Sequence, residues 1–387
     1  MLSVILVGMD AVTGLADDPA VVQRVLDHID NRTTDMAAGC WREPIENYRS
    51  PERYRAELDV VLRSGPVGFC PSAALAEPGS FVAREAAGTP IVAVRGRDGA
   101  VRAFLNACSH RGAQVACEPT GCASALVCPY HGWTYGLDGA LKGVPHGHGF
   151  PDLDKAGSGL TSFAAVERGG IVFVSQQPPT PEAVAELDTL PAMVPESYRF
   201  VRVDAIDVPA NWKIAVEGFL EGYHIRSTHP DTFYPVQYDN LNVVEPFGPN
   251  SRVTFPYRNV EAQRAVAPAE RSADGRLTYV YHLFPNVIVA TFPGRITLVV
   301  LEPVTIASTR FVVHTLSDHY DGTTGADEAL AGEESLVTQG AAQDRAVVAS
   351  IQRSLAANPR EFFEFGLFEG AIAHFHRQLR RRVTGAP

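Results

Sequence analysis

Cys108-Ser109-His110 and Cys128-Pro129-Tyr130-His131 each place one cysteine and one histidine within a few residues of each other. Thiolates and imidazoles are the ligands that zinc sites and iron–sulfur clusters use in proteins. A zinc finger usually pairs cysteine with cysteine and histidine with histidine, whereas each stretch here supplies one of each. The two stretches therefore predict a metal centre held between two loops, with an iron–sulfur cluster favoured and zinc as the alternative.

The residues around these ligands support the iron–sulfur interpretation. His110-Arg111-Gly112 and Cys128-Pro129-Tyr130-His131-Gly132-Trp133 resemble the two signature loops of Rieske proteins. In a Rieske [2Fe–2S] cluster two cysteines bind one iron and two histidines bind the other, which raises the reduction potential. The resemblance implies that the cluster ligands are Cys108, His110, Cys128 and His131, with Trp133 in their surroundings.

A second group of candidate ligands follows Asn211-Trp212-Lys213 and comprises Glu217, Glu221, His224 and His229. The spacing of Glu217, Glu221 and His224 predicts that they share one helical face. His229 can join His224 only if the helix ends or bulges, and Pro230 is placed to end it. The segment resembles the mononuclear-iron motif of Rieske non-haem iron oxygenases. Taken alone, it could equally be an acidic surface helix.

The resemblance implies that a third iron ligand, Asp344, comes from a helix near the C-terminus. The segment 343–352 has an amphipathic pattern and ends in Ile351-Gln352, as the corresponding segment of the family does. Two histidines and one carboxylate bind Fe(II) and leave positions open for O2. Glu333 and Glu334 are the competing acids, and Asp344 could instead face solvent.

Glu221 has a different expected role from the iron ligands. In the family a carboxylate at this position, most often aspartate, hydrogen-bonds a histidine ligand of the iron and a Rieske histidine of a neighbouring subunit. Glutamate occurs here in some demethylating and amine-oxidising branches. The resemblance implies that Glu221 couples the two metal sites. Asn211 and Glu217 are candidates for the surroundings of the iron, and Glu217 could equally lie on the helix surface.

Three apolar neighbours of these residues are candidates for the lining of a substrate pocket. They are Phe219, Leu220 and Tyr223. Aromatic and aliphatic residues at helical spacing more often belong to the hydrophobic core, so a packing role is the alternative.

The composition excludes several classes of protein. A net charge of −11 argues against a nucleic-acid-binding protein. No apolar run is long enough for a transmembrane helix, so no membrane association is expected. The apolar start, residues 1–8, is short and lacks the basic leader of a signal peptide. We therefore expect a cytoplasmic protein in which the cysteines stay reduced.

With 387 residues the chain is long enough for two domains and a large core. We expect an α+β fold in three parts. A helical N-terminal segment, residues 1–64, packs on the catalytic domain, and a small all-β Rieske domain follows at residues 65–175. The resemblance implies that residues 176–387 form a catalytic domain of the helix-grip type, in which an antiparallel sheet carries a long C-terminal helix. Within the last part we expect strands at 200–208, 252–257, 277–291, 296–303 and 309–317, and helices at 212–226, 326–356 and 360–383.

The resemblance is to the oxygenase (α) component of Rieske oxygenases, and it implies both cofactors and partners. Each subunit would hold one [2Fe–2S] cluster and one mononuclear Fe(II). Electrons from NAD(P)H would arrive through a reductase, with or without a ferredoxin. With O2 the chain would hydroxylate a small aromatic or related organic substrate, by monohydroxylation or cis-dihydroxylation.

Other activities and assemblies stay open at the level of the sequence. Within the same class, the alternative is oxidative N- or O-demethylation, including demethylation of quaternary amines. Outside it, the chain could be a non-catalytic Rieske electron carrier or a degenerate oxygenase that serves as a structural partner. The resemblance implies a homotrimer (α3), because the two metal sites of one subunit lie too far apart for electron transfer. Added β subunits would make the assembly α3β3.

Overall fold

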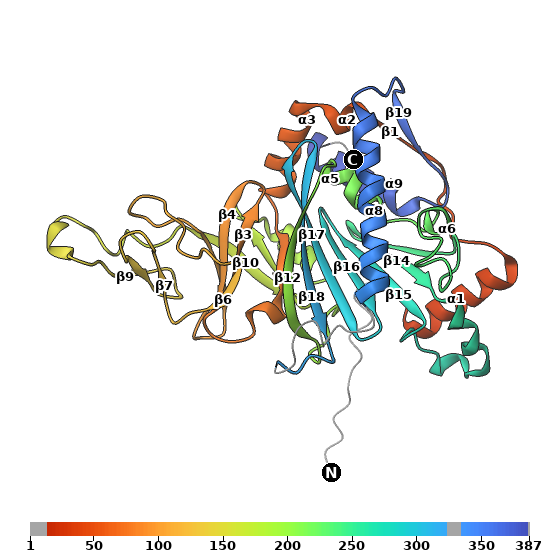
Figure 1. Cartoon of the computed structure of the whole chain (residues 1–387), viewed down its shortest axis with the longest axis horizontal. Coiled ribbons are helices and arrows are strands. Elements are labelled where there is room, and N and C mark those ends of the chain that lie inside the picture. The colour runs from red at the N-terminus through yellow and green to blue at the C-terminus, as the bar shows by residue number, and fades with distance from the viewer. Residues whose placement is uncertain (1–13, 323–333, 386–387) are drawn as a thin grey trace, which may run out of the picture.

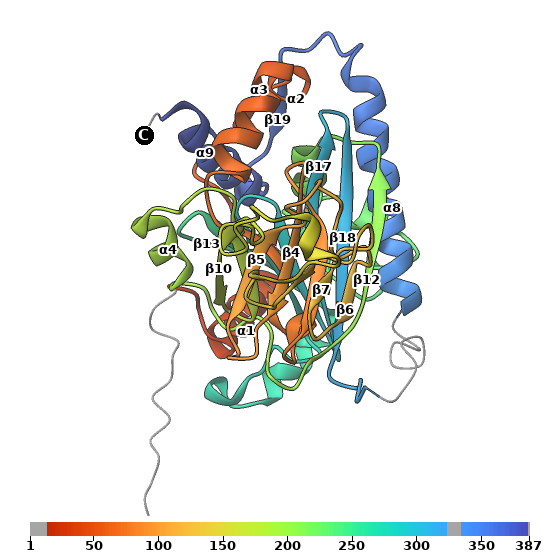
Figure 2. The same ribbon diagram turned by 90° about the vertical axis from the view of Figure 1, so that its left-hand side faces the viewer.

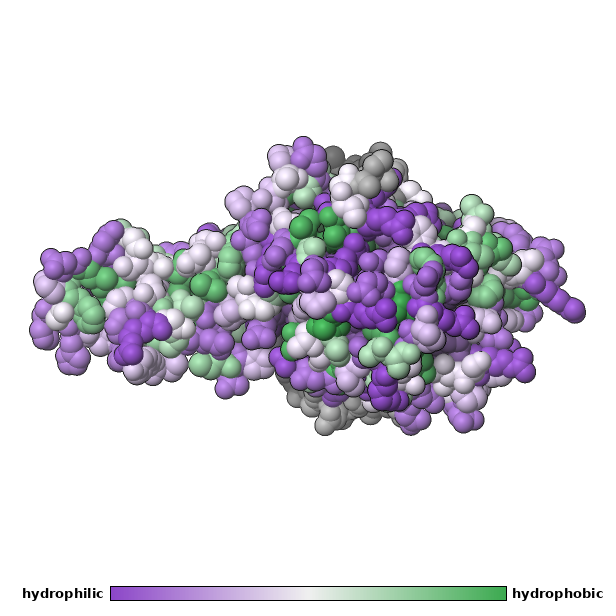
Figure 3. Space-filling view, turned by 90° about the horizontal axis from the view of Figure 1, so that it is seen from above, coloured by the Kyte–Doolittle hydropathy of each residue, from purple (hydrophilic) through white to green (hydrophobic). Residues whose placement is uncertain are grey.

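The computed structural model describes residues 14–322 and 334–385 of the chain. An elongated β-rich arm projects from a larger body, in which a long helix lies across a sheet (Figure 1). Figure 3 shows arm and body from above, with apolar residues scattered among polar ones over the surface. The expectations for residues 1–8, for the first part of the helix at 326–356, for Glu333 and for the side chain of Glu334 fall outside the described residues.

The arm, residues 67–175, is built from two antiparallel sheets. The larger has the strand order β2-β11-β10-β5-β4-β3-β6 and the smaller the order β7-β8-β9. The elements are β2 (Val67–Pro71), η3 (Ser72–Leu75), β3 (Ser80–Ala86), β4 (Thr89–Arg95), β5 (Val101–Leu105), β6 (Thr120–Cys122), β7 (Leu126–Val127), β8 (Thr134–Tyr135), β9 (Leu141–Gly143), η4 (Gly147–Gly149), β10 (Ser162–Arg168) and β11 (Ile171–Ser175).

Strands β4 and β5 form a hairpin around Asp98-Gly99, in which Arg95 pairs with Val101. Gly99 has a φ of +80°, a backbone conformation that glycine adopts without the strain that a side chain would bring.

The N-terminal part runs along the body and alternates short helices with one strand. Its elements are α1 (Asp18–Asn31), β1 (Trp41–Pro44), α2 (Glu46–Arg49), α3 (Pro51–Ala56) and η2 (Glu57–Leu62). The side chain of Asp17 caps α1 by accepting from the N–H of Ala20. The buried face of α1, which includes Val21, Val22, Val25 and Leu26, packs into the core of the body beside β13.

The body is organised around a seven-stranded antiparallel sheet of order β12-β18-β17-β16-β15-β14-β13. Its strands are β12 (Arg199–Val208), β13 (Val243–Phe247), β14 (Asn250–Pro256), β15 (Leu277–Leu283), β16 (Val287–Phe292), β17 (Arg295–Thr305) and β18 (Ser308–Ser317). Helix α4 (Pro181–Leu187) precedes β12, and four short helices lie between later strands: α5 (Trp212–Glu217), α6 (Ile225–Thr228), η5 (Arg258–Ala265) and η6 (Pro268–Glu270). The expected strand at 277–291 is therefore a hairpin of two strands.

The long helix α8 (Glu334–Leu355) runs along one face of this sheet (Figure 2). Helix α9 (Gly370–Thr384) contacts β13 and β14 and shares a hydrophobic core cluster with α8. Gly340, Val348, Ala349 and Leu355 are buried residues of α8, and the helix contacts α5 and α6. This arrangement confirms the α+β class, with an antiparallel sheet and a long C-terminal helix.

Two of the expected helices are interrupted. The segment 212–226 contains α5, a turn, and the start of α6. The segment 360–383 begins with a strand, β19 (Phe362–Phe365), which pairs with β1. Three of the four residues of β19 are phenylalanine, which favours strand over helix once a partner strand is available. In the part of the chain that the structure describes, no helix combines the length and apolar character needed to cross a bilayer.

Candidate metal centres and substrate cavity

Two loops of the arm bring the four predicted cluster ligands together. Cys108 and Cys128 are buried, with 4% and 2% of their surface exposed, while His131 is exposed. The Nδ1 atoms of His110 and His131 face each other at 3.1 Å. All six cysteines of the chain are free thiols, so neither buried sulfur is engaged in a disulfide. Two buried thiols below two converging imidazoles fit the donor set of a Rieske cluster.

Both loops have the same backbone design. The N–H of Gly112 donates to the carbonyl of Cys108 at 2.8 Å, and the N–H of Gly132 donates to that of Cys128 at 3.0 Å. Both glycines have positive φ, +80° and +71°. This conformation favours glycine, because a side chain would strain it. The repeated turn holds each cysteine and the histidine that follows it in the same relative orientation.

Aromatic and hydroxyl side chains surround the four ligands. Trp133 stacks on His110 with a centroid distance of 4.8 Å, so it lies where the sequence placed it, in the surroundings of the cluster site. Tyr130 stacks on His131 at 3.7 Å. The hydroxyl of Tyr135 lies 3.1 Å from Sγ of Cys108 and also contacts Ser109. Burial and the hydrogen bond with Cys108 raise the pKa of Tyr135. Sequence reasoning did not single out Tyr135, because only the fold brings it under the first loop.

His224, His229 and Asp344 form a second centre in the body. One ligand atom from each lies within 4.8 Å of the others. Oδ1 of Asp344 is 2.9 Å from Nε2 of His229 and 3.6 Å from Nε2 of His224. The side chain of His229 is almost fully buried, and its Nε2 atom has no hydrogen-bond partner among the described residues. The Nε2 atom is therefore available to bind a metal ion between the three side chains. Two imidazoles and one carboxylate in this geometry fit the facial ligand set of non-haem Fe(II).

The chain reaches this geometry through a break rather than a continuous helix. Helix α5 ends at Glu217, a turn follows, and His224 and His229 flank the single turn of α6. Gly222 allows the break, since a Cβ there would meet Oδ1 of Asn242 at 2.3 Å. The expectation that Glu217, Glu221 and His224 share one helical face is therefore wrong.

Two acceptors orient the histidines. Oε1 of Glu221 lies 2.5 Å from Nδ1 of His224, and Oε2 of the same carboxylate accepts from the backbone N–H of His224 at 3.1 Å. On the other ring, Oε1 of Gln343 lies 2.8 Å from Nδ1 of His229. Each contact occupies the Nδ1 atom of its histidine, so that the Nε2 atom of the same ring faces the centre of the triad. Gln343 was missed from sequence, although it directly precedes Asp344.

The pKa of His224 reflects two opposing effects. Burial lowers it, but the hydrogen bond and charge of Glu221, together with the charge of Asp344, outweigh burial and raise it. The imidazole thus lies in a field that attracts positive charge, as a metal-binding site requires.

Asn211 is not part of the triad. Its side chain caps α5 by accepting from the N–H of Lys213 at 3.0 Å, and it donates to the carbonyls of Tyr48 and Ile306. Its backbone N–H donates to Gln352 on α8 at 2.8 Å. Gln352, of the Ile351-Gln352 pair that resembles the family pattern, therefore helps to attach α8 to α5. This attachment fixes the position of the helix that carries Asp344.

Glu217 belongs to a buried polar network rather than to a helix surface. Its Oε1 accepts from the hydroxyl of Tyr48 at 2.6 Å and lies 2.8 Å from Nε2 of His376. Burial raises the pKa of Glu217 to about 8, while the hydrogen bond from Tyr48 and the charge of Lys213 oppose the rise. Burial also lowers the pKa of His376 to about 4. These two shifts favour neutral His376 beside protonated Glu217, and in this state the carboxyl group donates a hydrogen bond to the imidazole ring.

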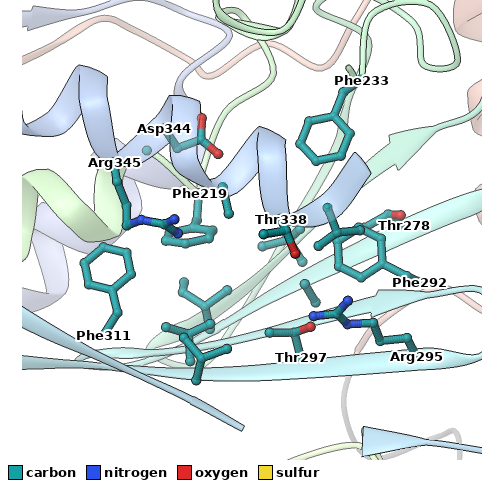
Figure 4. Close-up of a pocket in the computed structure, with 18 of the residues that line it drawn as sticks. Phe219, Phe233, Thr278, Phe292, Arg295, Thr297, Phe311, Thr338, Asp344 and Arg345 are labelled. Carbon is teal, nitrogen blue, oxygen red and sulfur yellow. The ribbon is translucent and has the colours of Figure 1, made fainter. Parts of the chain in front are cut away.

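A cavity of about 460 Å³ opens beside the triad, between α8 and the sheet. His224, His229 and Asp344 all line it. Figure 4 shows Phe219, Phe233, Phe292 and Phe311 around it, with Arg345 toward one end and Arg295 toward the other. Of the three pocket candidates, only Phe219 lines this cavity. Leu220 is fully buried in the core, and Tyr223 is 57% exposed and packs on Phe368.

Comparison with known proteins identifies two domains. Residues 66–156 match the Rieske [2Fe-2S] domain, and residues 195–385 match the catalytic domain of the ring-hydroxylating alpha subunit. The glycine betaine monooxygenase oxygenase subunit of Chromohalobacter salexigens is 30% identical over 262 residues, covering 65% of this chain and 55% of that protein. The toluate 1,2-dioxygenase subunit alpha of Pseudomonas putida is 30% identical over 220 residues, covering 53% and 48%.

The fold is also similar to solved structures. A quaternary ammonium Rieske monooxygenase in complex with L-carnitine superimposes with a TM-score of 0.73 at 22% identity, over 90% of this chain and 96% of the other. The chain spans about half the length of the curated relatives that it matches. The two domain matches and the arrangement of arm and body lead to one conclusion: this chain belongs to the Rieske non-haem iron oxygenases, as an oxygenase (α) component.

Proposed function

We propose that this chain is the terminal oxygenase of a Rieske system. It receives electrons that originate from NAD(P)H through a reductase, with or without a ferredoxin, and uses O2 to oxygenate a small organic substrate. The observation that carries the proposal is the convergence of His224, His229 and Asp344 at the wall of a cavity of about 460 Å³. A Rieske electron carrier would need neither a second ligand set nor a cavity beside it.

The proposed ligand roles follow the geometry. Cys108, Cys128, His110 and His131 hold the [2Fe–2S] cluster, and His224, His229 and Asp344 hold Fe(II). When bound, the cluster supplies electrons one at a time, and the iron supplies the site at which O2 meets the substrate.

Within this proposal the protein has three tasks at the iron site. Glu221 and Gln343 accept the Nδ1–H of His224 and His229 and so keep each Nε2 free to bind metal. The apolar residues of the cavity exclude water from the substrate. Glu221 keeps 12% of its side chain exposed, which leaves it within reach of a histidine from a neighbouring subunit.

Two reactions are candidates. Hydroxylation of a small aromatic or related substrate agrees with the similarity to toluate 1,2-dioxygenase. Oxidative N- or O-demethylation is favoured by glutamate at position 221 and by the similarity to glycine betaine monooxygenase. Demethylation releases one formaldehyde per O2 consumed, whereas ring hydroxylation releases none, so a formaldehyde assay on the active substrate separates the two.

The assembly proposed is a homotrimer, alone or with β subunits, because His131 is exposed on the arm while Glu221 lies in the body. Mass determination in solution by light scattering tests it. A monomer that is fully active would contradict it. In the cytoplasmic location that we propose, the exposed Cys40, Cys117 and Cys122 would stay reduced.

Iron and acid-labile sulfide, measured on protein purified without oxygen, test the proposal directly. We expect about three irons and about two sulfides per chain, from one [2Fe–2S] cluster and one mononuclear iron. Oxygen uptake with a chemical reductant and candidate substrates then tests turnover. About two irons that do not increase after addition of ferrous salt would instead favour the electron carrier.

A further inference from the structure

The sheet wall of the cavity carries two threonine side chains next to each other. Thr297 on β17 and Thr315 on β18 both line the cavity, and the strand register places them directly opposite each other. Opposite side chains on antiparallel strands have Cβ atoms about 4.5–5.5 Å apart, so the two hydroxyl groups can reach the same ligand atom. Ala290 on β16 is the partner of Thr297 on its other side, and its small side chain leaves room for a ligand group there.

Both hydroxyl groups are buried and lack partners. Thr297 is 8% exposed and Thr315 is 1% exposed. Within residues 14–322 and 334–385, neither Oγ1 atom has a hydrogen-bond partner. Buried polar groups in folded proteins are rarely left unsatisfied. Since both threonines line the cavity, a bound ligand can supply the missing partner.

A third threonine of the same cavity has a satisfied hydroxyl group. Thr278 on β15 is 2% exposed and lines the cavity, and its hydroxyl lies 2.9 Å from the hydroxyl of Tyr257. Burial in this wall therefore does not by itself leave a threonine without a hydrogen bond. The unsatisfied groups of Thr297 and Thr315 are a property of their own positions.

Two arginines lie beside the threonine pair. Arg202 is the partner of Thr315 on β12, and Arg295 precedes Thr297 on the same face of β17. Both arginines interact with other groups of the protein, and Arg202 forms an ion pair with Asp204 at 3.0 Å. The two threonines differ from these arginines, because their hydroxyl oxygens have no partner.

The threonine pair and the triad lie on opposite walls of the cavity. Figure 4 shows Thr297 on the sheet and Asp344 on α8, with the cavity between them. The rings of Phe219 and Phe311 line the same space. A ligand whose polar group is held at the sheet therefore extends its apolar part toward the triad.

We propose that Thr297 and Thr315 together bind one carbonyl oxygen of an otherwise apolar ligand. A carbonyl oxygen has two lone pairs and so accepts one hydrogen bond from each hydroxyl. That this ligand is a substrate rests on the proposed oxygenase function, whereas its binding to the two hydroxyls does not. The pair then decides which end of the substrate lies next to the iron, and thus which carbon atom is oxidised.

Titration calorimetry without oxygen or reductant, on the full-length protein with its iron and sulfide content determined beforehand, tests this proposal. The probes are 4-methylacetophenone and 4-ethyltoluene, which have the same carbon skeleton with and without the carbonyl oxygen. The quantity to compare is the ratio of the two affinities in each protein, because the difference in hydration between the probes then cancels.

The double variant T297V/T315V keeps the shape of both side chains and removes both hydroxyl groups. We expect its ratio of ketone to hydrocarbon affinity to fall at least about tenfold below that of the wild type, as the loss of two hydrogen bonds implies. T278V is the matched control, since Thr278 lines the same cavity and makes its hydrogen bond within the protein. It should keep the wild-type ratio.

Melting temperatures of the proteins without ligand provide a second measurement. T297V/T315V should melt no lower than the wild type, because a buried hydroxyl without a partner is unfavourable and its removal costs no hydrogen bond. A clearly lower melting temperature would show that the two hydroxyls have partners within the protein and would overturn the proposal.

The proposal is also overturned if the affinity ratio is unchanged in T297V/T315V, if T278V lowers it as much, or if the ketone does not bind the wild type at millimolar concentration. These outcomes are independent of the oxygenase function, which is read from iron content and oxygen uptake. A protein that binds the ketone through the two hydroxyls but holds no mononuclear iron would refute the oxygenase and retain the carbonyl site.

Discussion

Nδ1 of His224 lies 2.5 Å from Oε1 of Glu221, and Oε2 of Glu221 accepts from the backbone N–H of His224. The carboxylate therefore fixes both the tilt of the ring and which nitrogen carries the proton. Glu221 also keeps 12% of its side chain exposed.

Replacing Glu221 by alanine should lower turnover at least about a hundredfold while iron and sulfide stay near the wild-type content. The reason is that, in the proposed function, Glu221 orients a ligand histidine and couples the two metal sites without binding metal itself. Turnover and metal content, measured on the same preparation, check this. E196A, a change of an acid outside the site, is the control. Full activity in E221A would contradict the proposal that Glu221 couples the two metal sites.

Replacing Asp344 by alanine should lower the iron content from about three to about two per chain and leave the sulfide unchanged, because only the mononuclear site loses a ligand. Metal analysis after reconstitution with ferrous salt measures this. E334A, which removes the competing acid on the same helix, should keep the third iron. If E334A loses it and D344A does not, the assignment of the third ligand is wrong.

Replacing Tyr135 by phenylalanine should lower the reduction potential of the cluster. The hydroxyl of Tyr135 lies 3.1 Å from Sγ of Cys108, and hydrogen bonds to cluster sulfurs favour the reduced state. Loss of ~1 kcal/mol corresponds to a shift of roughly 40 mV for a one-electron couple. Redox titration followed by electron paramagnetic resonance checks the shift. Y130F, which leaves Cys108 untouched, is the control, and an equal shift in both variants would contradict the role of Tyr135.

The Glu217–His376 pair should make stability depend on pH. The pKa of Glu217 is raised to about 8 in the folded protein, so its contribution to stability is lost as pH rises toward 8. The pKa of His376 is lowered to about 4, so its contribution is lost only as pH falls below its ordinary value of 6.5. Between about pH 6.5 and 8, Glu217 alone should therefore lower the melting temperature as pH rises.

Calorimetric melting temperatures across this range check the prediction. E217Q keeps an uncharged group at the same position and should flatten the decline. E182Q, which changes an exposed acid of α4, should keep the wild-type slope. A decline in E217Q as steep as in the wild type would assign the pH dependence to other groups.

The local patterns in the sequence were informative where chemistry depends on neighbours in the chain. The cysteine–histidine pairs, the turn glycines and the spacing around His224 and His229 predicted which side chains would converge, and the structure brings the triad within 4.8 Å. These features are readable because a metal loop must place its donors within a few residues.

The sequence-based prediction was wrong where the local pattern of a segment is compatible with two different secondary structures. The periodicity at 212–226 predicts one helix, but α5 ends at Glu217, and the carbonyl of Gly222 accepts from the backbone N–H of Asn240, which lies outside the segment. Likewise the strand at 362–365 exists because β1 pairs with it. Local preference is weak, and a long-range contact decides the outcome.

By itself, then, the sequence determined the two ligand motifs, the α+β class and the order of arm and body, since these depend on residue type and local spacing. Only the tertiary structure decided what surrounds the ligands: Tyr135 beside Cys108, Gln343 on His229, and the residues that line the cavity next to the triad. The physical reason is that burial and hydrogen bonding join side chains from different strands and helices. Those pairings follow from sheet register and helix packing, which bring together residues that lie far apart in the chain.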